Sequence, residues 1–584
     1  MIGCSLLLSR VFPYLVVTVA SLGIGVTAFG GGLQFEEQSA SRFPQPDPDD
    51  YTNQLSIADV DGDGDLDIVF ANGGNFSSQG TPERVRLYIN DGTGVFTDES
   101  TTRLGGIGGN FRGVEFGDVD GDGDLDMVLA NDFQQLPALL INDGAGFFTN
   151  ESADRLPGIE LSSTRVAFGD IDNDGDLDLY FTKGGSNRFG CGQNQIYVND
   201  GAGFFTDETE SRHPLGNVCE PMDAIFGDID GDLDLDIRTA STSNNASKLY
   251  RNDGTGVFTD ISSGVPSDSD CYSYDFGDVD GDGDLDLLGA NAGPSLHELL
   301  LLNNGDGTYT DGSSQISPNL TIDDNDSKFF DYDNDGDLDL IIARLFSTSE
   351  AIYNNDGHGN FTQVSGIITS MSDATLDIGV GDLDGDGDLD IVTAQGESGN
   401  FDNRIYINTT GPADTIAPTI VRMEQLPDTD DAAGPYVVRA AVADQMTSDR
   451  NFFDKGIILS YSVDAGPVED VPMRWSGGQV YRGEIPGQPG GGTIEYFVMA
   501  TDFADNTGIG ESKSFTVTAD PGDCEGDANG DGVVDPLDSG FVLARFGCPV
   551  GTGDPSCDAA DQNGDGLVDP LDSGFVLARF GPCD

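Results

Sequence analysis

One acidic loop recurs seven times between residues 59 and 390 and divides this part of the chain into units of about 50 residues. The second copy, residues 117–131, reads GDVDGDGDLDMVLAN and carries Asp at every second position from Asp118 to Asp126. A unit of this size cannot bury its apolar face alone. Its repetition therefore predicts neighbouring units that stack in a row or close into a ring.

The acids of each loop need a cation. On a plain strand they would share one face, where charges ~4 Å apart repel by ~4 kcal/mol at an effective dielectric of about 20. Gly121 and Gly123 interrupt the strand pattern, and the sequence turns apolar from Leu125 onward. The acids therefore occupy a loop that leads into a buried strand.

The spacing D-x-D-x-D-G-x-x-D favours Ca²⁺. It places carboxylates at loop positions 1, 3, 5 and 9, a turn-forming Gly at position 6 and a backbone carbonyl at position 7, and Ca²⁺ takes roughly six to eight such oxygens. Position 12, which is Glu in an EF-hand, is Leu129 here, so Asp126 at position 9 must close the site. Mg²⁺ fits less well because it retains its waters, and an Asp/Gly turn without metal is the alternative for a single copy.

All seven loops supply predicted metal ligands. In the fourth loop Leu233 replaces the turn-forming Gly, which predicts weak binding or a distorted loop there, and Leu233→Gly is expected to strengthen this site. The ligands are Asp59, Asp61, Asp63, Asp65 and Asp67; Asp118, Asp120, Asp122, Asp124 and Asp126; Asp170, Asp172, Asp174, Asp176 and Asp178; Asp228, Asp230, Asp232 and Asp236; Asp278, Asp280, Asp282, Asp284 and Asp286; Asp331, Asp333, Asp335, Asp337 and Asp339; and Asp382, Asp384, Asp386, Asp388 and Asp390.

Each unit predicts four strands. In the second unit GVEFGDV, LDMVLAN and the two halves of ALLINDGAGFFTNES are the apolar pieces, and N-D-G-x-G marks a hairpin between the last two. Seven four-stranded units predict a closed β-propeller, whereas a linear array would need capping faces that the sequence does not provide. The last unit ends at RIYINTTG without a fourth strand, and FEEQS, residues 35–39, resembles the missing piece. We therefore expect the N-terminal strand to complete the last blade.

These motifs resemble the FG-GAP/VCBS family over residues 33–410, and are similar to the propellers of integrin alpha chains. The resemblance implies that the Ca²⁺ loops join the first and second strands of each blade. It also implies that the opposite face, formed by loops between blades and between second and third strands, contacts partners.

Composition restricts the partners and the compartment. A net charge of -77 excludes nucleic-acid binding. Residues 1–28 combine one charge, an apolar run and small residues near Ala28, which predicts a signal peptide and a secreted or cell-surface protein without a membrane span after cleavage. An uncleaved anchor from Val11 to Phe29 is the alternative.

The cysteines predict disulfides in an exported chain. Cys191 is expected to pair with Cys219, which leaves Cys271 unpaired, and all three are placed in loops of the partner face. The four cysteines near the C-terminus, Cys524, Cys548, Cys557 and Cys583, allow three pairings.

Two smaller modules follow a linker at residues 411–416. Short alternating strands over residues 417–518 predict a β-sandwich that resembles immunoglobulin/fibronectin-like modules, with a spacer role favoured over ligand binding. Over residues 521–584, DANGDGVVDPLD and DQNGDGLVDPLD are each followed by SGFVLARFG, which predicts a Ca²⁺ loop and a helix twice.

The tail resembles a type I dockerin, which implies docking to a cohesin-like partner. Positions 10 and 11 of both loops are Pro and Leu, and this departure leaves the particular partner open. Because the two halves are nearly identical, a Ca²⁺-stabilised C-terminal cap is the alternative. The predicted ligands, with Val533 and Leu567 acting through their carbonyls, are Asp527, Asn529, Asp531, Val533, Asp535 and Asp538, and Asp561, Asn563, Asp565, Leu567, Asp569 and Asp572.

Together these features predict a mainly β, exported calcium-binding protein of adhesion or assembly. Up to seven Ca²⁺ ions are expected in the propeller and two in the tail. The propeller is expected to bind a protein or glycan, and the tail a cohesin-like protein. Only three histidines occur, and neither G-x-S-x-G nor H-E-x-x-H is present, so an enzyme is not predicted. A dockerin-tethered polysaccharide hydrolase and a purely structural surface protein are the alternatives.

Overall fold

The computed structural model describes residues 33–584 apart from 47–49, 76–77, 188, 217, 244–245, 269, 292–295, 346–348, 397–398, 413, 445–455, 519–527, 529–532, 535, 549–556, 558–559, 562–565, 578–580 and 583–584. The predicted signal peptide lies outside the described residues. Within them, no helix has the length and apolar character needed to cross a membrane.

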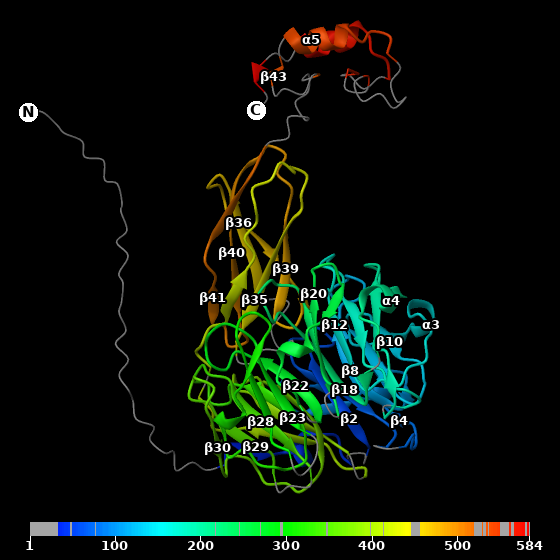
Figure 1. The fold of residues 1–584 in the computed structure, drawn as a ribbon, viewed down its shortest axis with the longest axis vertical. Helices are drawn as coiled ribbons and strands as arrows, with labels where there is room; N and C mark the ends of the chain where they lie inside the picture. The colour runs from blue at the N-terminus through cyan, green and yellow to red at the C-terminus, as the bar shows by residue number, and fades with distance from the viewer. Residues whose placement is uncertain are drawn as a thin grey trace, which may run out of the picture. The chain divides into compact units, whose positions relative to one another are not determined.

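The chain is mainly β and has propeller-like repeats (Figure 1). In its described part, residues 35–408 form seven sheets, six with four antiparallel strands and one with an added parallel strand, β26 (Ile316–Ser317). In chain order the sheets contain β2 (Thr52–Ala58), β3 (Asp67–Asn72), β5 (Arg86–Asn90) and β6 (Phe96–Asp98); β8 (Phe111–Gly117), β9 (Asp126–Asn131), β10 (Ala138–Asn142) and β11 (Phe148–Asn150); β12 (Val166–Gly169), β13 (Asp178–Phe181), β15 (Gln195–Asn199) and β16 (Phe205–Asp207); β18 (Pro221–Gly227), β19 (Asp236–Ser241), β20 (Lys248–Asn252) and β21 (Phe258–Asp260); β22 (Cys271–Gly277), β23 (Asp286–Asn291), β24 (Leu299–Asn303) and β25 (Tyr309–Asp311); β27 (Asp324–Phe330), β28 (Asp339–Arg344), β29 (Ala351–Asn354) and β30 (Phe361–Val364); and β31 (Thr375–Gly381), β32 (Asp390–Gln395), β33 (Arg404–Asn408) and β1 (Phe35–Glu37).

Consecutive sheets share apolar cores. Every residue of the second strand of each sheet is buried, because neighbouring sheets cover both of its faces. One cluster joins the first two sheets through Val69, Leu87 and Met127, and another joins the last sheet to the first through Val392, Ile405 and Ile68. The sheets therefore close on themselves, and we call residues 35–408 the repeat ring.

The predicted closure by the N-terminal strand is confirmed. β1 pairs antiparallel with β33, with Phe35 opposite Asn408 and Glu37 opposite Tyr406. Phe35 is fully buried against Phe330 and Tyr332 of the sixth sheet. The two ends of the repeat ring are thus joined in one sheet.

Short elements follow several outer strands. One-turn helices α1 (Ser39–Arg42), α2 (Ser100–Arg103), α3 (Ser152–Arg155) and α4 (Thr209–Arg212) end at arginines, whereas 3₁₀ turns η1 (Ser262–Gly264) and η2 (Ser313–Gln315) do not. A small ladder pairs β4 (Glu83–Arg84) with β7 (Gly108–Gly109).

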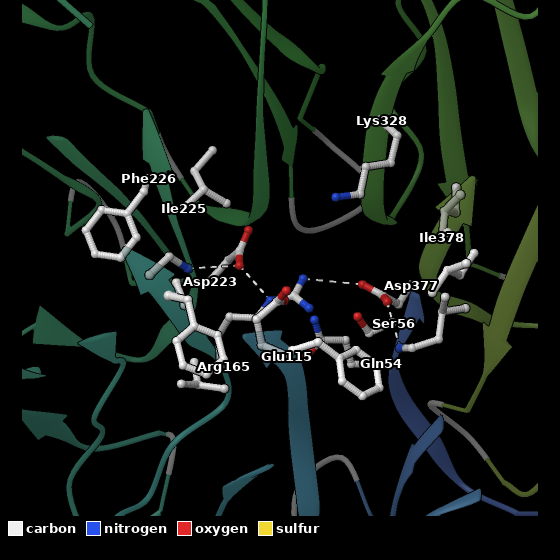
Figure 2. Close-up of a pocket in the computed structure, with 18 of the residues that line it drawn as sticks. Gln54, Ser56, Glu115, Arg165, Asp223, Ile225, Phe226, Lys328, Asp377 and Ile378 are labelled. Atoms are coloured by element: carbon white, nitrogen blue, oxygen red, sulfur yellow. Dashed lines mark hydrogen bonds and ion pairs between the residues drawn. The ribbon is translucent and has the colours of Figure 1, made fainter. Parts of the chain in front are cut away.

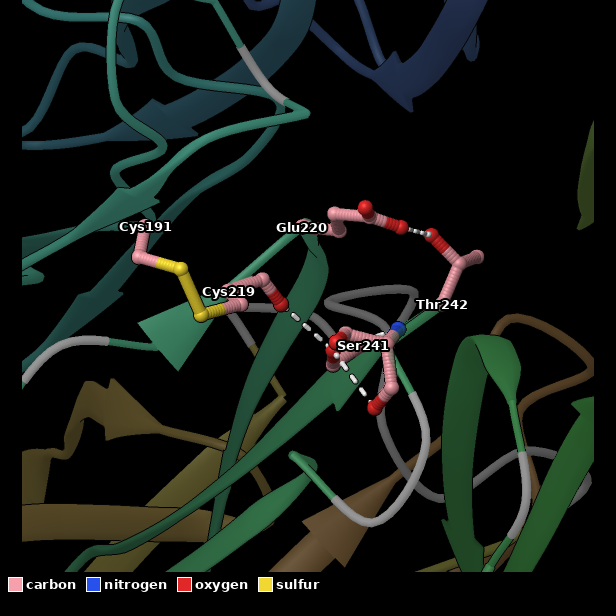
Figure 3. The surroundings of a disulfide bond; sticks show 6 residues. Cys191, Cys219, Glu220, Ser241 and Thr242 are labelled. Atoms are coloured by element: carbon pink, nitrogen blue, oxygen red, sulfur yellow. Dashed lines mark hydrogen bonds between the residues drawn. A yellow bond between two sulfur atoms is a disulfide. The ribbon is translucent and has the colours of Figure 1, made fainter.

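The predicted disulfide between Cys191 and Cys219 is present (Figure 3). It joins β14 (Cys191–Gly192), between β13 and β15, to β17 (Val218–Cys219), which precedes β18. Ser241 Oγ donates a hydrogen bond of 2.6 Å to the Cys219 carbonyl. Cys271 is unpaired as expected, but its placement in a loop was wrong, because it begins strand β22 and is fully buried.

Residues 419–517 form two sheets around one core. The first contains β34 (Thr419–Met423), β35 (Tyr436–Ala443), β39 (Val480–Ile485) and β38 (Arg474–Gly477). The second contains β37 (Glu469–Pro472), β36 (Ile457–Val463), β40 (Gly492–Thr501), β41 (Thr507–Ile509) and β42 (Lys513–Val517). Val438, Leu459 and Tyr496 are among the buried residues that both sheets contribute to the core. We call this unit the sandwich.

The described part of the tail contains two matching helices, α5 (Pro536–Leu543) and α7 (Pro570–Leu577). Their hydroxyls meet, with 2.8 Å between Ser539 Oγ and Ser573 Oγ, and Val542 and Val576 are fully buried in a shared core. A short ladder pairs β43 (Val533–Val534) with β44 (Gly581–Pro582). Each helix begins within the predicted 12-residue loop, because Pro has the backbone angle that a first helical residue requires. The described C-terminal disulfide joins Cys548 to Cys557.

Candidate metal centres

Each acidic loop of the repeat ring connects the first and second strands of its sheet, as the family resemblance implied. In the second loop, Asp118 Oδ1 accepts hydrogen bonds from the N–H groups of Gly121 and Asp122, at 2.8 and 3.1 Å, and Oδ2 accepts one from Gly123 at 3.1 Å. Asp122 accepts from Asp124 N–H at 3.0 Å. The acids at positions 1 and 5 thus shape the loop through its own backbone.

The acid at position 9 ties the loop to the hairpin of its sheet. Asp126 accepts hydrogen bonds from Val119 N–H at 3.1 Å and from Asn142 N–H at 2.8 Å. Asn142 Nδ2 in turn donates to Leu125 O at 3.1 Å and to Val60 O of the preceding sheet at 2.8 Å. Asn142 Oδ1 also accepts from Gly144 and Gly146 within the turn. One side chain therefore links the loop, the hairpin and the neighbouring sheet.

The same asparagine recurs around the repeat ring. Its Nδ2 bridges to the preceding loop at 2.7–2.9 Å in six sheets, from Asn90, Asn142, Asn199, Asn252, Asn303 and Asn355. In the seventh sheet the buried Asn408 Nδ2 has no hydrogen-bond partner among the described residues. The N-D-G sequence predicted only a hairpin turn, so this bridging role was missed.

The acid at position 3 leaves one oxygen unsatisfied in every loop. Within the described structure, the Oδ1 atoms concerned are buried and lack a hydrogen-bond partner; they belong to Asp61, Asp120, Asp172, Asp230, Asp280, Asp333 and Asp384. Buried polar atoms are nearly always hydrogen-bonded, so seven equivalent exceptions call for a ligand. The predicted acids also come together, since carboxylate oxygens of Asp118, Asp120 and Asp122 lie within 4.8 Å of one another, as do matching sets in other loops.

Arginines of the one-turn helices α1 to α4 hold the other oxygen of position 3 in four loops, and Arg251 of β20 lies 3.6 Å from that oxygen of Asp230 in a fifth. Arg155 Nη2 lies 3.2 Å from Asp120 Oδ2, while its Nη1 donates to Ala202 O of the next sheet at 2.7 Å. Equivalent ion pairs join Arg42 to Asp384, Arg103 to Asp61 and Arg212 to Asp172, at 2.9–3.0 Å. The four helix arginines follow a Phe of the outer strand by seven residues each time, a spacing that the sequence interpretation did not use.

The acid at position 7 packs against the hairpin glycine of its own sheet. A Cβ at Gly144 would lie 2.5 Å from Asp124 Oδ2, and the corresponding glycine and acid approach as closely in the other sheets, as for Gly92 with Asp65 at 2.6 Å. Gly144 also has a positive φ of 76°. Space and backbone angle together explain why the turn requires glycine.

The prediction of a distorted fourth loop was wrong. Leu233 has a φ of 67°, a left-handed conformation like that of the glycines at this position, and Asp228 still accepts from Gly231 and Asp232 at 2.8 and 3.1 Å. Leu233 is only 4% exposed. Burial of an apolar side chain offsets the strain of about 1–2 kcal/mol that this conformation costs.

Electrostatics also favour a cation in the loops. Burial raises the pKa of Asp67 and Asp286 to about 8 and that of Asp126 to about 7, against the opposing effect of backbone N–H donors. Neighbouring loop acids raise the pKa of each group further. The donor set, all oxygen and mostly carboxylate, fits Ca²⁺, which would hold these groups ionised.

The tail loops are described only in part. Asp527, Asn529, Asp531, Asp535, Asn563 and Asp565 lie outside the described residues. Asp538 and Asp572, at position 12, are fully buried. Asp561 Oδ2 accepts from Gly566 N–H at 2.9 Å, and Asp572 Oδ2 accepts from Asp569 N–H at 2.8 Å. Val533 lies in β43, and the Leu567 side chain is exposed.

First strands of the repeat ring also surround a small polar cavity of about 110 Å³ (Figure 2). Arg165 donates to Asp223 at 2.7 Å and to Asp377 at 3.3 Å, across three sheets. Asp377 also accepts from Leu55 N–H at 2.9 Å, which links the last sheet to the first. These contacts join the third, fourth, seventh and first sheets around the cavity.

A model of the FG-GAP-like repeat matches residues 59–129, 118–181, 239–289 and 331–393. With the geometry above, these four matches support a β-propeller of the FG-GAP type. The chain has no significant match among curated proteins.

Several solved structures align with the chain at low similarity. The Penicillium chrysogenum alpha-L-arabinanase complexed with arabinobiose is 10% identical, with 65% of this chain and 97% of that chain covered and a TM-score of 0.34. The polysaccharide lyase Uly1 is 10% identical, with coverages of 64% and 96% and a TM-score of 0.33. A Ca²⁺-stabilized adhesin with which an Antarctic bacterium binds ice is 12% identical, with coverages of 81% and 100% and a TM-score of 0.14. Likeness at this level carries no argument about function.

Proposed function

We propose that this chain is an exported calcium-binding protein of adhesion or assembly. It would combine a seven-bladed β-propeller, an immunoglobulin/fibronectin-like sandwich and a dockerin-like tail. The observation that carries the calcium assignment is the unsatisfied Oδ1 of position 3, repeated in all seven described loops. A buried oxygen without a hydrogen-bond partner, repeated in every loop, supports a repeated ligand.

Bound Ca²⁺ would supply the positive charge that the clustered acids lack. The residues of the chain order the loop and connect it to its neighbours. Asp118 orders the loop backbone, and Asp126 connects the loop to Asn142 and hence to the preceding sheet. Metal binding would therefore stabilise contacts between sheets as well as each loop, because binding to the folded state adds to folding free energy.

Calcium removal tests this assignment. We expect a chelator to lower the melting temperature of the full chain by many degrees. Asp120→Asn, which removes one charge beside the unsatisfied oxygen, should reduce the bound calcium by one ion, measured by elemental analysis of dialysed protein. Asp143→Asn, an equal charge change in the exposed hairpin of the same sheet, should leave the count unchanged. An unchanged melting curve with chelator, together with equal counts in both variants, would exclude the calcium role.

The proposed partner of the tail is a cohesin-like protein. Leu537 and Leu571 occupy equivalent places on α5 and α7 and are 66% and 65% exposed, so each half offers the same apolar side chain. Two alternative docking faces follow from this duplication. In the calcium-loaded full chain, Leu537→Ala alone should leave capture of a cohesin module nearly intact, whereas adding Leu571→Ala should abolish it. If no cohesin module binds the unaltered chain, the tail is a cap.

The proposed partner of the propeller is a protein or a glycan on a cell surface. An array of glycans and surface proteins, probed with and without Ca²⁺, separates binding from a purely structural role. The hydrolase alternative has less support, because the cavity of about 110 Å³ is below the roughly 300–1,000 Å³ of typical ligand pockets and Arg165 pairs with two of its acids. Release of products from a polysaccharide would favour the enzyme.

A further inference from the structure

The hairpin between β38 and β39 of the sandwich meets the repeat ring without space for additional atoms. Asp170 N–H donates a hydrogen bond of 2.7 Å to Ser476 O. A Cβ at Gly477 would lie 2.5 Å from Leu235 Cδ1, and one at Gly478 would lie 2.8 Å from Phe226 O. Gly477 and Gly478 both have a positive φ, of 127° and 51°. The hairpin sequence therefore suits a close approach of two backbones.

Apolar side chains continue this contact. Trp475 packs against the sandwich core and also against the core shared by the second and third sheets of the repeat ring. Val480 is 1% exposed and belongs to the cluster of the third and fourth sheets, with Phe226 and Leu235. Trp475 and Gly478 also line the polar cavity of the ring. The hairpin thus closes that cavity on the side of the acidic loops.

Arginines of the sandwich meet acids and carbonyls of the third and fourth loops. Arg439 Nη1 lies 2.5 Å from Asp234 Oδ1, and donates to Leu233 O at 3.0 Å and to Asn173 Oδ1 at 2.8 Å. Arg482 Nη1 donates to Asn173 O at 3.0 Å. Asp234 is at loop position 7, where a calcium loop uses the backbone carbonyl, so its side chain is available for this ion pair.

We infer that the loop face of the third and fourth sheets is a docking surface whose partner is the sandwich of the same chain. The sandwich is then a fixed closure of the ring cavity, in contrast to the spacer that its sequence predicted. External partners of the repeat ring must use surfaces that the sandwich leaves free. This docking depends on shape, apolar burial and charge pairing, and it does not require the loops to hold calcium.

The chain contains a single tryptophan, Trp475, which lies in this contact and reports on it directly. In the full-length protein with Ca²⁺ present, we expect blue-shifted Trp475 emission and weak quenching by acrylamide. Combining Asn173→Gly with Asp234→Ser removes side-chain partners of Arg439 without altering the sandwich. Glycine suits the left-handed backbone of residue 173, whose φ is 61°. This double variant should red-shift the emission by several nanometres and raise the quenching constant about two-fold or more.

Three further variants complete the test. Arg439→Glu should undock the sandwich as well, and Asp234→Arg added to it should restore the original emission. Lys248→Glu makes the same charge change at an exposed ion pair with Asp260 on the outer part of the fourth sheet, and should leave Trp475 unaffected. Far-UV circular dichroism checks that the sheets stay folded. Unchanged Trp475 emission in folded Asn173→Gly/Asp234→Ser and Arg439→Glu variants, or full accessibility in the unaltered chain, would overturn the inference.

Discussion

At the scale of single residues, asparagines and acids together hold each loop in place through hydrogen bonds. The asparagine at the end of the third strand satisfies carbonyls of two sheets and two turn N–H groups, while its own N–H binds the acid at position 9. Its amide offers donors and an acceptor at once, which no carboxylate can do. This explains why the end of the third strand carries asparagine whereas position 9 of the loop carries aspartate.

Asn142→Ala should reduce the free energy of unfolding by about 2–4 kcal/mol, because it leaves buried carbonyls and turn N–H groups without partners. Asn408→Ala is the matched control, since its Nδ2 has no partner among the described residues and its Oδ1 accepts from Gly411 alone in the turn. The control should cost about 1 kcal/mol. Denaturant unfolding of both variants with Ca²⁺ present measures the difference; equal losses would contradict the bridging role.

Leu233→Gly should not strengthen the fourth site, contrary to the sequence-based expectation. The substitution relieves about 1–2 kcal/mol of backbone strain but exposes a cavity where a leucine worth about 2 kcal/mol was buried. The loop hydrogen bonds are already formed with leucine in place. We expect unchanged calcium stoichiometry and an unfolding free energy equal to or slightly below that of the unaltered chain. Tighter calcium binding in a titration would instead show that leucine distorts the loop.

At the scale of elements, the connections after the outer strands differ around the ring. Helices α1 to α4 place arginines between a loop acid and a carbonyl of the next sheet, whereas η1 and η2 end without a basic residue. These arginine contacts between adjacent sheets therefore run from the seventh sheet through the first, second and third to the fourth. They begin beside β1, the strand that closes the ring.

Phe35→Ala should release the N-terminal strand. Loss of a fully buried Phe costs about 3–5 kcal/mol, and β1 has only three residues paired to β33. Phe96→Ala is the matched control, because Phe96 is similarly buried in the outer strand of the first sheet but lies within continuous chain. We expect early proteolytic cleavage before residue 50 and concentration-dependent association, through the exposed sheet edge, only in Phe35→Ala. Deletion of residues 33–39 should have the same effect, and a monomeric deletion variant with unchanged melting would disprove closure.

At the scale of the whole molecule, charge dominates. The net charge is -77, and nine Ca²⁺ ions would neutralise roughly a quarter of it. The acids on the surface repel one another through solvent and are screened by salt, while the acid at position 9 of each loop is buried and screened far less. Calcium and salt should therefore stabilise the chain in different ways.

After chelation, about 1 mM Ca²⁺ should restore most of the lost melting temperature, whereas 0.15 M NaCl should restore only a small part, because screening does not reach buried carboxylates. Mg²⁺ at the same concentration as Ca²⁺ should be less effective, since it keeps its waters. Melting curves in the three conditions decide between specific binding and general screening. Equal rescue by NaCl and Ca²⁺ would favour screening.

The sequence by itself determined the local plan of the repeats and their closure. Alternating acids, turn glycines and apolar runs are short-range patterns, so they predicted loop, strand and hairpin and even the pairing of residues 35–39 with the last sheet. The same patterns located the loop acids, including the unsatisfied position 3. The calcium that those acids would bind stays a prediction.

Only the tertiary structure decided which distant groups meet. That Asn142 reaches the preceding sheet, that Arg155 holds Asp120, that Leu233 is buried and that Arg439 meets Asp234 all depend on how separate sheets and the sandwich pack. Local sequence fixes backbone angles and the facing of side chains over a few residues. Contacts between distant segments, such as that of Arg482 with Asn173, 309 residues apart, arise when both segments bury shared apolar surface. The free energy of that burial depends on the area and not on the distance along the sequence.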